Sequence, residues 1–168
     1  MRRLDCRGHA ALEFVLVFCA VLLPVTLMLV SMANLLWIWH SVAEFTRDGA
    51  RYAATHCWQS GAPNVVSYMR SHVPVNIDQT RFSEGEAEIQ VQYFSWDTES
   101  GQLSEFSCDG GDCSTLCVPD TVTVRVTNYE FRGLAAYLGL PTVTIPAFET
   151  SLPMESAGCD PEQATCEP

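Results

Sequence analysis

A run of 26 residues without Asp, Glu, Lys or Arg, from Phe14 to Trp39, limits what this chain can fold into more than any other feature. As an α-helix the run would be about 39 Å long, which exceeds the roughly 30 Å hydrocarbon core of a bilayer. We therefore interpret it as a single membrane-spanning helix. Pro24 lies deep in the run and is expected to kink or loosen this helix, because proline has no backbone N–H and clashes with the preceding turn.

The charges on the two sides of the apolar run are unequal. Arg2, Arg3 and Arg7 precede it, whereas the chain after it is strongly acidic, and the formal net charge of the 168 residues is −11. The positive-inside bias predicts a cytoplasmic N-terminus, a single pass through the membrane and an exported C-terminal part. Nucleic acid is not an expected partner, because binding phosphates needs clustered Lys and Arg, and this chain has nine Arg and no Lys.

Glu13 places one carboxylate at the very start of the apolar run, where an unpaired charge is costly. A cleaved secretory signal does not account for this N-terminus, because its apolar segment is much shorter and is closed by a small-residue cleavage site. A plain uncleaved anchor fits the hydropathy, but it gives Glu13 no role beyond a place at the level of the lipid headgroups.

The stretch RGHAALEF, residues 7–14, resembles the processing site of type IV prepilins. The resemblance implies that a membrane-embedded prepilin peptidase cuts after Gly8, so that His9 becomes the first residue and Glu13 the fifth. Cleavage creates a free α-amino group at the edge of an apolar medium, and a carboxylate one helical turn along neutralises it, in the same chain or in a neighbouring subunit. Gly8 and His9 are thus the candidate cleavage site, and Glu13 and Phe14 are the candidate assembly residues.

Beyond the apolar run, the sequence predicts a helix that continues outside the membrane and then a small sheet. Residues 41–58 keep apolar side chains at three- and four-residue steps, with acid–Arg pairs on the other face. A short amphipathic helix is expected at 64–72, after a break at Gly61–Asn64. The apolar period then changes to two, which predicts strands at 86–93, 120–126 and 141–150. We expect a bulge near Asn128 and an edge position for the strand that contains Pro146.

The order of these elements predicts an α+β fold. It consists of a long N-terminal transmembrane and amphipathic helix, a short second helix, and a three-stranded antiparallel sheet packed on the distal half of the first helix.

Six of the eight cysteines follow the apolar run, and an even number in an exported segment is typical of disulfides. Connectivity does not follow from the sequence, although we predict that the last two pair and close a short loop. The spacings between the cysteines do not match the two CxxC-like pairs that usually bind zinc, so neither a metal nor a cofactor is expected. The disulfide candidates are Cys57, Cys108, Cys113, Cys117, Cys159 and Cys166.

Two further stretches resemble the TadE-like minor pseudopilins of tight-adherence, Flp-type IVb pilus systems: GARYAA at 49–54, and VTVRVTNYEF leading into RGLAAYLGLPTVTIPAFETSLPME. The resemblance implies a prepilin leader at 1–8, a transmembrane helix at 9–40, its periplasmic continuation at 41–58, a small α+β pilin domain at 59–155 and a disulfide-tied tail at 156–168. The implied partners are other pilins, the pilus-assembly platform, prepilin peptidase and the inner membrane. The processed subunit then also belongs in the extracellular pilus.

Other functions remain open at this point. An unprocessed single-pass anchor that holds a periplasmic scaffold or adhesin domain accounts for the hydropathy and the cysteines, and a type II secretion pseudopilin would place its cut before Phe rather than His. An enzyme is not expected. Of the four histidines, none lies beside a Ser or Cys with an orienting carboxylate.

Overall fold

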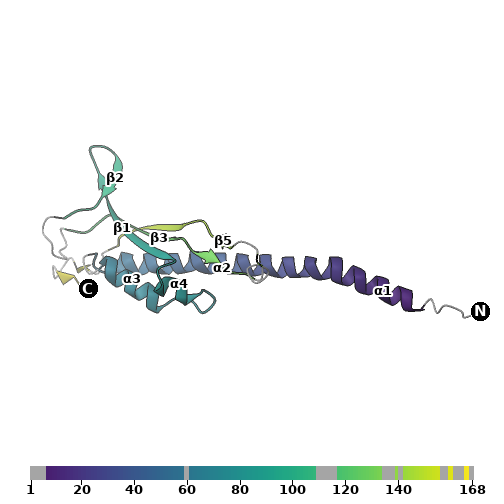
Figure 1. The fold of residues 1–168 in the computed structure, drawn as a ribbon. Helices are drawn as coiled ribbons and strands as arrows, with labels where there is room; N and C mark the ends of the chain where they lie inside the picture. The colour runs from purple at the N-terminus through teal and green to yellow at the C-terminus, as the bar shows by residue number, and fades with distance from the viewer. Residues whose placement is uncertain are drawn as a thin grey trace, which may run out of the picture.

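The structure is a computed structural model, and it describes residues 7–58, 61–108, 117–133, 139, 142–155, 159–160 and 165–166. One long helix runs through the molecule, and a small sheet with two short helices packs around the half of it that is farther from the N-terminus (Figure 1). The other half of the long helix projects away from the sheet. This arrangement confirms the predicted α+β class.

The long helix is built from α1 (Arg7–Val17), a π-helical turn η1 (Phe18–Leu22) and α2 (Leu23–Thr55). The π turn lies directly before Pro24, which occupies the first turn of α2. Proline cannot donate a hydrogen bond to the turn before it, and the wider π spacing accommodates the missing bond. The expected loosening at Pro24 therefore takes the form of a local π turn within a helix that continues on both sides.

The distal half of α2 buries the face that the sequence predicts. Its buried residues recur at three- and four-residue steps from Val42 to Ala54, and Arg47 and Arg51 lie on the exposed side. Arg47 pairs with Glu44 at 2.6 Å and Arg51 with Asp48 at 3.7 Å, as the spacing predicts. The helix ends at Thr55 rather than at Trp58, because His56 has an extended backbone with φ −114° and ψ 157°.

Two short helices follow. The first, α3 (Gly61–Ser71), begins earlier than expected: Gly61–Asn64 forms its first turn and does not separate it from the preceding helix. Proline is tolerated in the first turn of a helix, because the N–H groups there have no partner within the helix. The second, α4 (Gln79–Ser83), was not predicted; Asp78 caps it by accepting a hydrogen bond from the backbone N–H of Thr80 at 3.1 Å.

The main sheet has four strands, not the three that were predicted. All neighbours are antiparallel, and the order is β2 (Gln102–Glu105), β1 (Glu88–Asp97), β3 (Thr121–Thr127) and β6 (Phe148–Pro153). The additional strand is β2, which forms a hairpin with the distal end of β1. All four of its residues are exposed, so its sequence lacks the apolar alternation by which a half-buried strand is recognised.

The segment predicted as the third strand is divided in two at Pro146. Val143–Thr144 forms β5, which pairs with β4 (Glu130–Phe131) in a separate two-stranded sheet, and β6 joins the main sheet. The expected edge position is confirmed, since β6 lies at one end of the main sheet. A strand break takes the place of the expected bulge: β3 stops before Asn128, whose φ is 59°, a left-handed conformation that Asn tolerates.

The core lies between the sheet and the two helices α2 and α3. Side chains from β1 and β3 alternate into it, and Tyr129 and Phe131 are also buried there after the change of direction at Asn128. Fully buried members include Val42, Val65, Met69, Phe82, Val122 and Val124. The amphipathic half of the first helix therefore covers the small sheet, as predicted, and α3 covers it as well.

Candidate functional site: the N-terminal helix and its junction with the domain

The prepilin-like motif lies in α1, and from His9 onward its side chains lie away from the domain; the Phe14 ring stacks on Phe18 of the same long helix. His9, Glu13 and Phe14 are all exposed, and Phe14 keeps 70% of its side chain accessible. Among the described residues, Glu13 has neither a hydrogen bond nor an ion pair. Residues 9 and 13 are one helical turn apart, which is the spacing at which a helix N-terminus and a carboxylate meet.

The helix around this motif exposes a continuous apolar surface. The exposed large side chains from Leu12 to Trp39 are 39–70% accessible, whereas Leu35 and Ile38, at the distal end of this stretch, pack against the core of the domain. The helix from His9 to Thr55 is long enough and apolar enough to cross a membrane, by length and composition. An uncovered surface of this size must be covered by lipid or by other helices.

Aromatic side chains mark the end of this surface. Trp37 is 68% exposed, and Trp39 is 41% exposed with its ring edge-on to Phe148 at a centroid distance of 5.1 Å. These positions agree with the interfacial belt that exposed tryptophans form at membrane boundaries. Trp58 is half-buried against the core, with its ring edge-on to Phe106 at 5.0 Å, as expected of a residue beneath the sheet.

Gly49, the first residue of the Gly-Ala-Arg stretch at 49–51, lies where α2 packs against the Met69 side chain of α3. A Cβ built on it would lie 2.4 Å from Sδ and 2.7 Å from Cε of Met69, a side chain that is only 1% exposed. Ala50 is fully buried in the same interface, whereas Arg51 is exposed. The motif is thus explained by packing: a missing side chain at residue 49 leaves room for Met69.

The structure describes five of the six candidate disulfide cysteines. Cys108 and Cys117 form a disulfide with Cα atoms 6.0 Å apart, and the carbonyl oxygen of Cys117 accepts a 2.7 Å hydrogen bond from the indole N–H of Trp58. Cys57 is also disulfide-bonded. Cys159 and Cys166 lie opposite each other in the two-residue strands β7 (Cys159–Asp160) and β8 (Thr165–Cys166). Cys113 lies outside the described residues.

We expect peptide mapping without reduction, after digestion at Asp and Glu, to recover Cys108 linked to Cys117 and Cys159 linked to Cys166. The first pair is bonded in the structure, and the second pair faces across a strand ladder at a separation that a disulfide can span. We expect the third link to join the remaining two candidates, Cys57 and Cys113. Fragmentation of each linked peptide assigns the bonds, the reduced digest is the control, and a link between Cys113 and Cys117 would contradict this connectivity.

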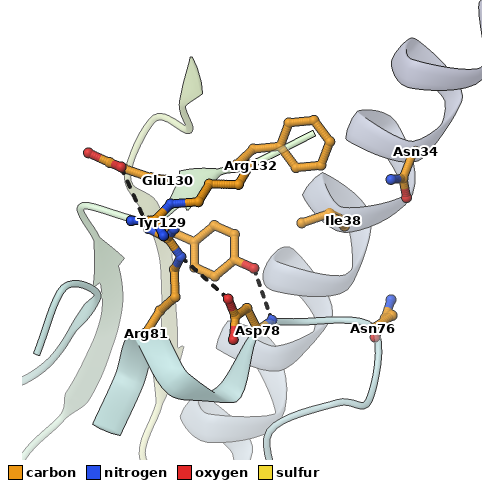
Figure 2. Close-up of a pocket in the computed structure, with 9 residues that line it drawn as sticks. Asn34, Ile38, Asn76, Asp78, Arg81, Tyr129, Glu130 and Arg132 are labelled. Carbon is orange, nitrogen blue, oxygen red and sulfur yellow. Dashed lines mark hydrogen bonds and ion pairs between the residues drawn. The ribbon is translucent and has the colours of Figure 1, made fainter. Parts of the chain in front are cut away.

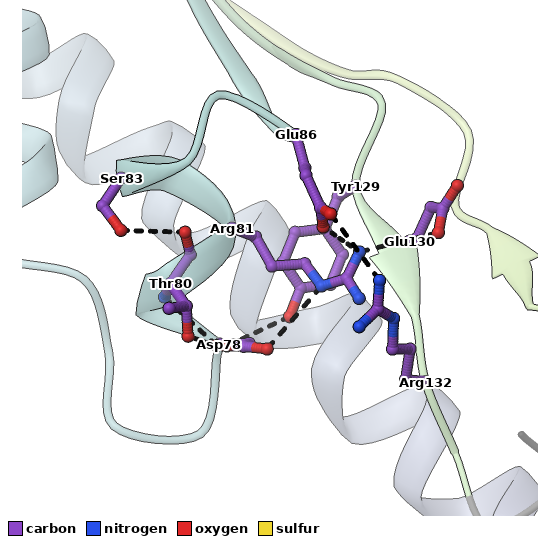
Figure 3. Close-up of polar contacts among 8 residues, drawn as sticks. All are labelled: Asp78, Thr80, Arg81, Ser83, Glu86, Tyr129, Glu130 and Arg132. Atoms are coloured by element: carbon purple, nitrogen blue, oxygen red, sulfur yellow. Dashed lines mark hydrogen bonds and ion pairs between the residues drawn. The ribbon is translucent and has the colours of Figure 1, made fainter. Parts of the chain in front are cut away.

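A buried arginine at the junction of domain and helix was not predicted from the sequence. Arg81, in α4, is 2% exposed and lies among three carboxylates (Figure 3). Its Nε lies 3.6 Å from Asp78, and its Nη1 lies 2.8 Å from Glu86 and 3.6 Å from Glu130. The nearby Arg132 shares Glu86 at 3.6 Å. Only the fold brings residues 78–86 and 130–132 together, so no local pattern could have indicated this cluster.

Hydrogen bonds support the cluster from both sides. The hydroxyl of Tyr129 accepts a 3.1 Å bond from the backbone N–H of Asp78. The Thr80 hydroxyl and backbone N–H donate to the Asp78 carboxylate and, with the positive charge of Arg81, hold its pKa below the ordinary value. Asp78 is therefore a carboxylate at neutral pH, and its charge compensates that of Arg81.

These features define a class of protein: one N-terminal helix that is long and apolar enough to cross a membrane, with a small antiparallel sheet packed on its distal half. The model of the family described as TadE-like protein matches residues 8–51. The matched range runs from Gly8 to Arg51, so the N-terminal helix of the chain is similar to that of the TadE-like family. No curated protein and no solved structure matches the chain.

Proposed function

We propose that this protein is a non-enzymatic minor pilin of a type IVb tight-adherence pilus. In this proposal prepilin peptidase removes residues 1–8, residues 9–40 hold the protein in the inner membrane, and 41–58 carry the helix into the periplasm. Residues 59–155 form the pilin domain and 156–168 the disulfide-tied tail. The cleaved subunit then joins the pilus or initiates it, and other pilins and the assembly platform are its partners.

The observation that carries this proposal is the exposed apolar helix that starts directly at the motif Gly8–Phe14. A plain membrane anchor accounts for the exposed apolar surface, but not for a lone carboxylate at its first turn. A helix that leaves the bilayer and packs side by side with other helices accounts for both, because Glu13 can then neutralise an α-amino group at residue 9. The match to the TadE-like family supports the same interpretation.

Charge favours a subunit present in few copies. Removal of residues 1–8 takes away three Arg and Asp5, a net charge of +2, and so changes the formal charge from −11 to −13. Neighbouring copies of so acidic a domain repel each other at low ionic strength. An initiating, tip or adaptor position is therefore more favourable than a position repeated along a shaft.

Mass spectrometry of the mature N-terminus tests this function. In cells with prepilin peptidase we expect a chain that starts at His9, and in cells without the enzyme a chain that starts upstream of Gly8. Bulky substitution at the cut, as in Gly8→Leu, should give the unprocessed chain in both strains, because only a small residue lets the backbone enter a protease site without a clash. An unprocessed wild-type chain in the presence of the enzyme favours the alternative, a membrane-anchored periplasmic scaffold or adhesin.

A further inference from the structure

A pocket of about 130 Å³ opens beside the Arg81 cluster, between the domain and the long helix (Figure 2). On the domain side, Arg81, Glu130 and Arg132 line it, and on the helix side Asn34 and Ile38. A second, acidic pocket adjoins it and shares Glu130; its other lining residues are Glu86, Asn128 and Thr144. The two pockets place guanidinium groups and carboxylates next to each other in one recess.

Arg81 has donors that the described residues do not use. Its Nη2 is buried and has no hydrogen bond and no ion pair within the described chain. Its Nη1 lies 2.8 Å from Glu86, but at an angle that does not make a hydrogen bond. A buried N–H group without an acceptor is unfavourable, and a guanidinium fork matches the oxygens of a phosphate well. The Nη2 group of Arg81 thus lacks an acceptor among the described residues.

The net charge around the pocket determines which kind of ligand could accept hydrogen bonds from Arg81. Two guanidinium groups, of Arg81 and Arg132, face the three carboxylates of Asp78, Glu86 and Glu130, so the cluster has one negative charge in excess. A simple anion would add to that excess. A zwitterion with a phosphate and an ammonium group would satisfy the free guanidinium donors and the surplus carboxylate together.

The position along the helix indicates where such a ligand comes from. From Phe14 to Asn34 an α-helix rises about 30 Å, which equals the thickness of the hydrocarbon core. Asn34 and Ile38 therefore lie at the boundary where the helix leaves the bilayer, at the same level as the exposed rings of Trp37 and Trp39. At this level the abundant groups that carry a phosphate are lipid headgroups.

We propose that this recess binds the headgroup of a zwitterionic aminophospholipid, with its phosphate on Arg81 and Arg132 and its ammonium group on Glu130 and Glu86. The bound lipid holds the base of the domain against the membrane surface until the subunit leaves the bilayer. This inference rests on the membrane insertion that the proposed function includes. It adds a lipid of defined headgroup chemistry to the partners of the subunit.

Native mass spectrometry of the full chain in detergent tests the site. The chain is mixed with equal amounts of dioleoyl phosphatidylethanolamine and dioleoyl phosphatidylglycerol, which differ only in the headgroup. We expect one retained phosphatidylethanolamine with a preference of about tenfold, the size of one charge-assisted hydrogen bond. Glu130→Gln should reduce the preference to near unity, because the two lipids differ in the group that Glu130 contacts. Arg132→Gln should reduce retention of both lipids, because both carry a phosphate.

Arg47→Gln is the matched control, because Arg47 is 55% exposed and Arg132 is 59% exposed, each beside one Glu, and Arg47 lies outside the pocket. It should leave the retention of both lipids and the preference unchanged. Equal retention of both lipids by the wild type, an unchanged preference in Glu130→Gln, or unchanged retention of both lipids in Arg132→Gln overturns the proposal. Displacement by equimolar soluble glycerophosphoethanolamine overturns it as well. A chain that is cleaved after Gly8 in membranes but shows no preference contradicts this inference alone, whereas a chain absent from membranes contradicts the proposed function as well.

Discussion

Gly49→Leu should destabilise the folded domain by about 2–3 kcal/mol, although it improves the intrinsic helix propensity of α2. Leucine is favoured over glycine in a helix by up to about 1 kcal/mol, so propensity alone predicts a gain. At this position, however, even a Cβ meets Met69 at 2.4 Å, and overpacking a filled core costs about 1–3 kcal/mol or more. Packing therefore outweighs helix propensity, and the substitution lowers the stability of the domain. A fall of roughly 10 °C in the unfolding temperature is the expected result.

Thermal unfolding of the full chain in detergent, followed by circular dichroism, measures this effect. Arg47→Leu is the matched control, since it places the same side chain two residues away on the exposed face and removes only the ion pair with Glu44. Exposed pairs contribute at most about 1 kcal/mol. Adding Met69→Ala to Gly49→Leu should restore part of the loss, because it removes the atoms that clash. Unchanged stability in Gly49→Leu would show that α2 and α3 do not approach so closely.

Glu13→Ala should prevent incorporation into pili while leaving membrane insertion and cleavage after Gly8 intact. The proposed role of Glu13 is to neutralise the α-amino group of residue 9 where helices pack away from water. An unpaired charge at such a place costs about 3 kcal/mol or more, which corresponds to a reduction in assembly on the order of a hundredfold. Quantitative immunoblots of the sheared pilus fraction and of the membrane fraction measure the two steps separately.

The control for this experiment is Glu44→Ala. Glu44 is also a helical carboxylate, but it pairs with the exposed Arg47 at 2.6 Å beyond the apolar run. Its removal should leave the amount of protein in pili within about twofold of the wild type, since an exposed pair contributes little. If Glu13→Ala pili contain as much of the protein as wild-type pili, the carboxylate has no role in assembly. The anchored scaffold or adhesin then becomes the better explanation.

The sequence predicted the helical half of this protein well, because the signals there are local. The charge-free run, the spacing of the acid–Arg pairs on α2 and the buried face from Val42 to Ala54 all repeat with the period of one helix. Two of the stretches that carry the family resemblance lie in the same region, and the TadE-like family model matches residues 8–51 there. The alternation of β1 and β3 was likewise readable, since one face of each is buried.

The errors occurred where local pattern carries little information. β2 consists of four exposed residues, so only its pairing with β1 defines it as a strand. Gly61–Asn64 looks like a helix break by composition, yet it begins α3, because Gly and Pro are acceptable in a first turn. Pro146 indicated an edge but not the division of the segment between two sheets.

By itself, the sequence determined that the chain has a long apolar helix with a processing-like motif at its start, and that its distal half is amphipathic. Tertiary structure alone decided which side chains meet at the base of the domain. Arg81 is surrounded by Asp78, Glu86 and Glu130 because α4 and the segment after β3 converge beside Ile38 of α2. Hydrophobic periodicity records which face of one element is buried, whereas a charge cluster assembled from separate elements exists only after the chain has folded.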